Sequence, residues 1–230
     1  CLQKHQVEQD LREQKIREVF STAPAPVNFY DLLFDQKVFL GALIRSLGQE
    51  NLFDIKSYAN SNVVLTPTNE LCTEMYRTLL QNNIIAISPD SPIDAFVMDD
   101  FFPNTIYPHK ATYHINLYYP EDKQALIDDI LNPTYYSPVD QEAALNMWKK
   151  IALGECLQYL KFSLTKVKFP FTPGPKTYKV FDMLLNDFST AQIYGIIWKA
   201  VAATAKLQLE KGLSKNHAAN AVITACERIG

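Results

Sequence analysis

The chain has 230 residues, of which 47% are hydrophobic and 12% aromatic, and its formal net charge is −3. A chain of this length and composition can bury a sizeable core in one large domain or two ordinary ones, which excludes a disordered protein. No apolar run reaches the roughly 18 residues that a membrane span needs, and no signal-peptide pattern opens the sequence. We therefore expect a cytoplasmic protein with no membrane partner, and its compactness favours a bacterial source.

The four cysteines, Cys1, Cys72, Cys156 and Cys226, form no C-x-x-C pair. The last three fall in helical patterns, where cysteine behaves as a small buried hydrophobe, and this favours a reducing compartment. The chain opens on Cys1, so we expect a fragment or a processed form, with a lipid-modified amino terminus as the alternative. Cys1 and His5 are too few for a metal site. No cofactor-binding motif is found, and we expect neither a metal nor a cofactor.

Residues 1–28 are predicted to form an N-terminal helical arm followed by a proline linker. Apolar residues such as Val7, Leu11 and Ile16 recur at roughly helical spacing between residues 3 and 20. The prolines of APAPVN at 23–28 disfavour helix at the residues before them. We expect the arm to pack on the rest of the chain or on a partner.

Residues 29–119 are predicted to form a winged-helix-like α+β domain. Asp35 is expected to cap the first helix, and Thr66 the longest one, with Pro67 at its first position. Two short helices, a longer helix and then strands are the order of a winged-helix unit. The expected elements are helices at 35–48, 51–59 and 67–82, then strands at 84–88, 93–97 and 112–119.

Residues 120–230 are predicted to form an all-α helical domain, so the fold class is α+β and predominantly helical. Its clearest helix runs from 188 to 212, where Ser189 and Gln192 form a capping box and Gly212 supplies the left-handed stop. This helix is apolar on most of its circumference, Trp198 included, which predicts a central position in its domain. The other expected helices are at 121–131, 141–162 and 176–187, with a last one after Ser214.

The charges are unevenly distributed along the chain. Residues 29–119 hold five basic and ten acidic residues, whereas residues 120–230 hold thirteen basic and eleven acidic ones. On the expected DNA-reading helix, one arginine stands against two glutamates, and four aspartates lie in or just beyond the expected wing. Such a surface would repel duplex DNA, and it favours protein docking. We therefore expect any surface that attracts phosphate to lie in residues 120–230.

The segment 161–179 is the best candidate for binding nucleic acid. It contains five lysines, no acidic residue and four aromatic residues. Basic groups interleaved with aromatic rings can hold single-stranded nucleic acid by phosphate attraction and base stacking. The alternative is a loop edged by lysines whose rings lie in the core, and the lack of arginine weakens the case for specific phosphate binding. The candidate binding residues are Lys161, Lys166, Lys168, Lys176 and Lys179.

The histidines do not assemble into a recognisable site. His217 is expected in the first turn of the last helix, sharing an edge with Thr224 and Arg228. Cys226 lies nine residues further on, about 13 Å along the helix axis and at a different angle, which disfavours joint catalysis with His217. His109 and His114, downstream of two aspartates, lack an H-x-H or H-x-x-x-H spacing. We therefore assign no catalytic or metal-binding residue.

Three functions are compatible with these patterns. The favoured hypothesis is a non-enzymatic interaction or regulatory module that docks a protein partner or self-associates. The alternative is nucleic-acid binding, to single strands or without sequence preference, through residues 161–179. The third is an enzyme whose site is assembled from residues scattered along the chain.

Overall fold

The computed structural model describes residues 2–119, 123–133 and 138–230. Helices dominate it, accompanied by one small antiparallel sheet of three strands. The predicted class, α+β and predominantly helical, is confirmed. Contacts within the chain divide it into two compact units, Cys1–Ala143 (unit 1) and Ala144–Gly230 (unit 2).

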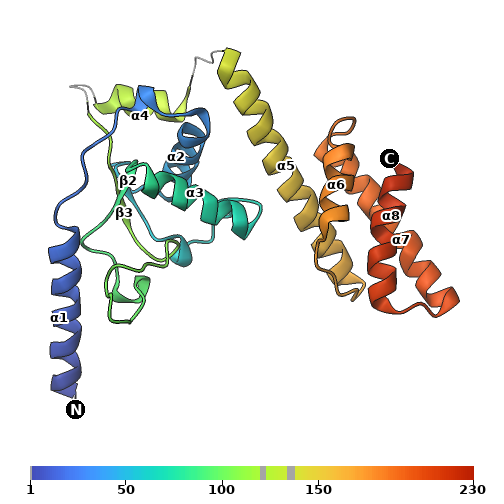
Figure 1. Cartoon of the computed structure of the whole chain (residues 1–230), viewed down its shortest axis with the longest axis horizontal. Helices are drawn as coiled ribbons and strands as arrows, with labels where there is room; N and C mark the ends of the chain where they lie inside the picture. The colour runs from blue at the N-terminus through green and yellow to red at the C-terminus, as the bar shows by residue number, and fades with distance from the viewer. Residues whose placement is uncertain (1, 120–122, 134–137) are drawn as a thin grey trace. The chain divides into compact units, whose positions relative to one another are not determined.

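Unit 1 is built around the small sheet (Figure 1). The strand order is β1-β3-β2, and Tyr113 on the central strand pairs with both Ile55 and Ile87. Tyr113 and Ile115 are buried whereas His114 between them is exposed, because successive side chains of a strand point to opposite faces. The elements are α2 (Phe34–Leu47), β1 (Asp54–Ile55), α3 (Asn69–Gln81), β2 (Ile85–Ile87), β3 (Tyr113–Ile115) and α4 (Lys123–Leu131).

Helix α4 lies in unit 1, whereas the sequence assigns it to the helical second half. Its apolar face, made by Leu126, Ile127 and Ile130, is buried, and the helix contacts α2. The compact unit consequently extends to Ala143 and not to the expected division after residue 119. A helical pattern shows which face is apolar, but it does not show which neighbour covers that face.

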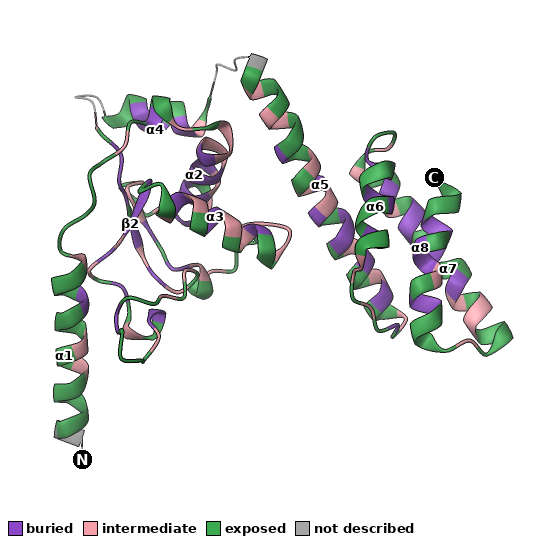
Figure 2. Ribbon diagram, viewed as in Figure 1, coloured by how far each residue is buried: buried purple, intermediate pink, exposed green. Residues whose placement is uncertain are grey.

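Helix α1 (Leu2–Phe20) packs its C-terminal half on the segment around the 3-10 helix η3 (Ile93–Ala95). Ile16 is buried, and the rings of Phe20 and Phe96 stack with centroids 5.6 Å apart. The rest of α1 is exposed along most of its length (Figure 2). The predicted arm is thus a helix that packs on its own chain.

Four local predictions in unit 1 are wrong. Asp35 does not cap α2, because the helix already begins at Phe34 and its N-cap is Leu33. The helix expected at 51–59 is not formed, since these residues contain β1 and the start of the 3-10 helix η2 (Tyr58–Asn60).

The strand expected at 93–97 is η3, because Ala95 N–H bonds to the carbonyl of Pro92 and closes a local turn. Helix α3 is capped by Thr68, whose hydroxyl accepts the N–H of Leu71 at 3.2 Å. The expected cap, Thr66, instead donates its hydroxyl to the carbonyl of Thr68.

Unit 2 is a bundle of helices in which α7 packs along α8, and α6 also contacts α8 (Figure 1). Its core is apolar and includes the fully buried Leu160, Phe181, Ile197, Ala200 and Val222. Among the described residues, no helix combines the length and hydropathy that a membrane span requires. The helices are α5 (Pro138–Lys166), which begins in unit 1, α6 (Pro175–Leu184), α7 (Thr190–Lys211) and α8 (Lys215–Ile229).

The end signals of α7 and α8 are confirmed. Ser189 accepts the N–H of Gln192, while the Gln192 side chain accepts the N–H of Ser189 at 2.9 Å. Gly212 has φ of 64°, the left-handed conformation that glycine adopts without strain. Ser214 caps α8 by accepting the N–H of His217 at 3.2 Å.

Candidate nucleic-acid interface

The two units carry opposite net charges. Unit 1 contains ten basic and twenty acidic residues, and unit 2 contains twelve basic and five acidic ones, giving net charges of −10 and +7. Three of the five acidic side chains of unit 2 are already paired with lysines: Asp182 with Lys149, Glu210 with Lys206 and Glu227 with Lys176. The remaining positive charge makes unit 2 attractive to a polyanion.

The lysine segment runs from the end of α5 through a loop into α6, and all five of its lysines are exposed. Lys176 is partly neutralised, because its ammonium pairs with Glu227 at 3.1 Å and donates to Thr224 at 3.1 Å. Lys161, Lys168 and Lys179 form no ion pair with any residue that the structure describes. These three charges are therefore available to a ligand.

The backbone at the end of α5 fixes the direction of the segment. Lys168 has φ of 57°, and the next N–H, of Phe169, returns to the carbonyl of Leu164 at 2.9 Å. This is the pattern of a Schellman stop, with a lysine in the position that glycine usually occupies. Phe169 is buried in the core while Lys168 remains in solvent. The local fold thus anchors the ring and leaves the charge outside.

Two of the four aromatic residues of the segment support a structural loop, and the other two support a binding surface. Phe169 is buried and Phe171 packs against the core, as a structural loop requires. Phe162 is 54% exposed and Tyr178 47% exposed, as a binding surface requires. The ammonium of Lys166 lies 4.3 Å from the centre of the Phe162 ring, which is a cation–π contact at the surface.

A row of aromatic rings continues from Phe162 onto α7. The ring centres of Tyr159 and Phe162 are 6.3 Å apart. Tyr159 also stacks on Tyr194, with ring centres 4.4 Å apart. Trp198, one helical turn beyond Tyr194, is 64% exposed, although its helix was expected to be covered on nearly all sides. Sequence reasoning missed this row. The sequence spacing places Tyr159 near Phe162 on one helix and Tyr194 near Trp198 on another. Only the fold shows that these two helices, α5 and α7, lie together.

The polar edge predicted on α8 is confirmed. His217, Thr224 and Arg228 line a shallow groove of about 410 Å³ together with Asn220. Cys226 faces the core, and burial raises the pKa of its thiol to about 12. The exposed His217 and the buried Cys226 therefore do not act on a common substrate.

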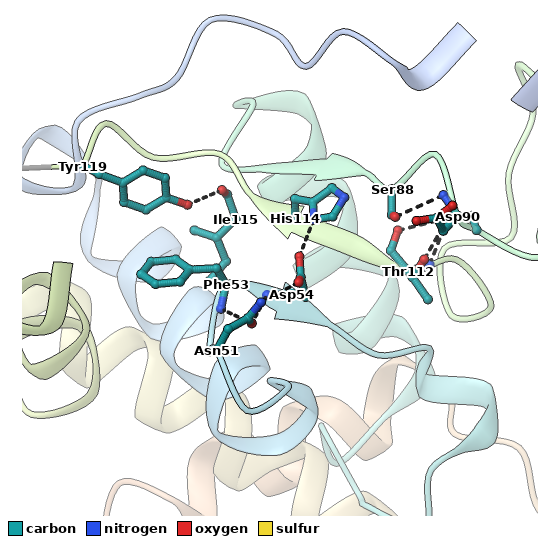
Figure 3. Close-up of polar contacts among 10 residues, drawn as sticks. Asn51, Phe53, Asp54, Ser88, Asp90, Thr112, His114, Ile115 and Tyr119 are labelled. Carbon is teal, nitrogen blue, oxygen red and sulfur yellow. Dashed lines mark hydrogen bonds and ion pairs between the residues drawn. The ribbon is translucent and has the colours of Figure 1, made fainter. Parts of the chain in front are cut away.

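His114 has a structural partner on the sheet (Figure 3). The His114 ring forms a close contact with the Asp54 carboxylate on the adjacent strand, and Asn51 donates to the same carboxylate at 2.6 Å. Burial alone would raise the pKa of Asp54, but the hydrogen bonds from Asn51 and His114 and the charge of His114 outweigh it, and the pKa is lowered. The carboxylate is thus held in its charged form.

The serines near His114 are used to shape turns. Ser91 exchanges hydrogen bonds with Thr112, donating its hydroxyl to the carbonyl and accepting the N–H, both at 3.1 Å. The Ser88 hydroxyl accepts the N–H of Asp90 at 3.2 Å (Figure 3). Across the described residues, no three His, Cys, Asp or Glu side chains lie close enough together to hold a metal ion.

Comparison with known proteins assigns the chain to no family. No protein-family model matches it, and no curated protein or solved structure matches it either. The charge, the exposed lysines and the aromatic row of unit 2 are therefore the features from which a function is inferred.

Proposed function

We propose that the chain is a non-enzymatic module that binds single-stranded nucleic acid through unit 2. The observation that carries this proposal is the placement of exposed lysines beside exposed aromatic rings on a unit with a net charge of +7. Neutralising phosphates releases counterions and supplies affinity, while stacking on aromatic rings accepts any base. Lys161 and Lys166 flank Phe162 in sequence, so both kinds of contact are offered within one stretch of α5.

We infer that unit 1 is a winged-helix variant with a role other than reading duplex DNA. The order α2–β1–η2–α3–β2–β3 and the sheet order β1-β3-β2 support this topology, with the second helix reduced to the 3-10 helix η2 (Tyr58–Asn60). The surface of α3 exposes Glu70 and Arg77. Asp94, Asp99 and Asp100 are exposed in the long loop before β3, where Asp94 pairs with Lys110 at 3.2 Å. A surface of this charge repels the phosphates of a duplex.

The proposal is tested by fluorescence anisotropy with labelled single-stranded DNA, single-stranded RNA and duplex DNA of equal length. We expect both single strands to bind more tightly than the duplex, because only unpaired bases can stack on the rings. Replacing Phe162 with alanine should weaken single-strand binding by about 1 kcal/mol or more, the value of one stacked base. Phe101→Ala, which removes an even more exposed ring from acidic unit 1, is the matched control and should change nothing.

A second candidate function, self-association, is favoured by one observation on α7. Ala191, Gly195, Trp198 and Ala202 are all exposed on one face of the helix, and Leu209 at its far end is 81% exposed. A second copy of the chain presents the same apolar face, so two such faces can cover each other. Sedimentation velocity should then show a dimer that Leu209→Asp dissociates. A monomer at all concentrations would exclude this candidate and leave nucleic-acid binding untouched.

A further inference from the structure

An acidic side chain lies at one end of the aromatic row of unit 2. Residues Glu155, Tyr159, Phe162 and Lys166 follow one another on α5 at spacings of four, three and four residues, which places them on one face of the helix. The Phe162 ring contacts both of its neighbours on this face, the Tyr159 ring at 6.3 Å between centres and the Lys166 ammonium at 4.3 Å. This face of α5 thus offers a hydrogen-bond acceptor, two rings and a positive charge in a fixed order.

The Glu155 carboxylate is exposed and able to accept hydrogen bonds from a ligand. It forms no ion pair with any residue that the structure describes, whereas Asp182, Glu210 and Glu227 of the same unit are paired with lysines. Burial raises the pKa of the Tyr194 hydroxyl, and the negative charge of Glu155 raises it further, so Glu155 acts on the row from close by. A free carboxylate repels phosphates. Its place beside a phosphate-binding surface therefore calls for a ligand group that it can accept.

The α7 side of the row leaves room for a flat ligand beside Tyr194. The small residues Ala191 and Gly195 are exposed on the same face of α7 as Tyr194, and the exposed Trp198 follows one turn further on. A Cβ atom added at Gly195 would meet nothing within 4 Å outside its own stretch of helix. A base can therefore lie over these small residues, against the Tyr194 ring and with one edge toward Glu155.

Guanine is the base whose edge fits a free carboxylate. An ionised carboxylate only accepts hydrogen bonds, through its two oxygens. The Watson–Crick edge of guanine presents two adjacent donors, the ring N1–H and the N2 amino group. The same edges of adenine, cytosine and thymine place an acceptor next to the donor, so a carboxylate can accept only once from each of them. Bases of single strands are read in this way, by stacking combined with hydrogen bonds to their edges.

We propose that Glu155 selects guanine in the single strand that the aromatic row binds, an inference that rests on the proposed function of unit 2. The two carboxylate oxygens accept the N1–H and the N2 amino group of one guanine. The base packs against Tyr194, and Lys161 and Lys166 hold the neighbouring phosphates. Glu155 is thus a specificity-determining residue, which favours one base and slightly weakens the binding of strands that lack it.

The experiment uses the full chain and fluorescence anisotropy with short thymidine strands of equal length, in which the same central position carries guanosine, inosine, adenosine or thymidine. We expect the guanosine strand to bind about tenfold more tightly than the adenosine strand, which is the discrimination that one good bidentate pair provides. Inosine lacks the amino group and keeps one of the two donors, so its strand should bind with an affinity between the two.

Glu155→Gln keeps the size of the side chain and removes its charge. The guanosine strand should then bind within about twofold of the adenosine strand, because the bidentate pair is lost. The all-thymidine strand should bind at least as tightly as before, because a charge that repels phosphates is gone. Asp187→Asn, which neutralises an exposed acidic residue of the same unit between α6 and α7, is the matched control and should retain the tenfold preference, to about the same value.

The outcomes separate guanine selection from single-strand binding itself. Equal and measurable binding of the guanosine and adenosine strands by the original chain would overturn guanine selection and leave the proposed function intact. So would a guanosine preference that survives in Glu155→Gln, or a loss of affinity in that variant that is the same for all four strands. The absence of binding to every strand would contradict the proposed function, and the selection of guanine with it.

Discussion

Unit 1 and unit 2 satisfy their backbone polar groups in different ways. Unit 1 has short strands and long loops, and side chains such as Asn51, Ser91 and Asn116 hydrogen-bond to the loop backbone. Unit 2 consists of helices, which pair their own backbone groups, so its polar side chains are not required for that purpose. This difference agrees with Lys161, Lys168 and Lys179 of unit 2 being available to a ligand. In unit 1, by contrast, Asp54, Ser88 and Ser91 have structural partners.

The largest expected effect is on the core of unit 2. Phe181 is fully buried there, and its replacement by alanine should lower the free energy of unfolding of this unit by about 3–5 kcal/mol, because a cavity replaces the ring. Both tryptophans, Trp148 and Trp198, lie in unit 2, so tryptophan fluorescence during urea denaturation reports on this unit alone. If the amide-exchange protection of Tyr113 and Ile115 in unit 1 were lost at the same urea concentration, the division into two units would be contradicted.

A smaller effect is expected from the buried amide of Asn116 in unit 1. It donates to the carbonyl of Asn83 at 2.8 Å and to that of Ala25 at 3.3 Å, and so ties the proline linker to the turn between α3 and β2. Asn116→Ala should destabilise unit 1 by about 2 kcal/mol, because both carbonyls lose a buried donor. Amide hydrogen exchange should rise at Val27, which bonds to the backbone of the same residue. Unchanged exchange at Val27 would show that the linker is held by other contacts.

The helix caps provide a matched pair, one in each unit. Ser189→Ala removes the cap of α7, and Thr68→Ala removes the cap of α3. Each change should lower the free energy of unfolding of its own unit by about 1 kcal/mol. Tryptophan fluorescence should detect only the Ser189 change, whereas amide hydrogen exchange along α3 should detect only the Thr68 change. An effect of either variant on both signals would show that the two units unfold together.

The smallest expected effect is the pH dependence contributed by Asp54. Burial tends to raise the pKa of the Asp54 carboxyl, but hydrogen bonds from Asn51 and His114 lower this pKa below its ordinary value of 3.8. A lowered pKa favours folding above that ordinary value, and the contribution is lost as the pH falls through the lowered value. Asp54→Asn should therefore reduce the loss of unfolding free energy at acid pH by less than about 1 kcal/mol, as measured by urea denaturation. Asp100→Asn, which changes an exposed aspartate in the loop before β3, should retain the original pH profile.

Local signals were sufficient to predict much of the fold. The capping box at Ser189 and the stop at Gly212 depend on neighbouring residues alone, and both were predicted correctly. The place of α4 beside α2 and the exposure of Trp198 depend on which distant element covers which face. Periodicity carries no such information, so these features became visible only in the fold.

The candidate sites follow the same rule. The five candidate lysines lie together in the sequence. They are exposed in the structure, as lysine side chains usually are. The aromatic row and the placement of Glu155 beside Tyr194 join residues from separate elements. No single stretch of sequence contains either of them.

The salt dependence of single-strand binding tests the central claim most directly. If Lys161, Lys166, Lys168 and Lys179 each hold one phosphate, log K against log salt should have a slope of about −2.8 or steeper, and affinity should fall about fiftyfold between about 50 and 200 mM salt. Replacing these four lysines with glutamine should flatten the slope by about 2.8. The same change at Lys4, Lys15, Lys56 and Lys123, four exposed lysines of unit 1, should leave it unchanged. No binding at the lower salt, or equal flattening by both variants, would contradict a nucleic-acid site on unit 2.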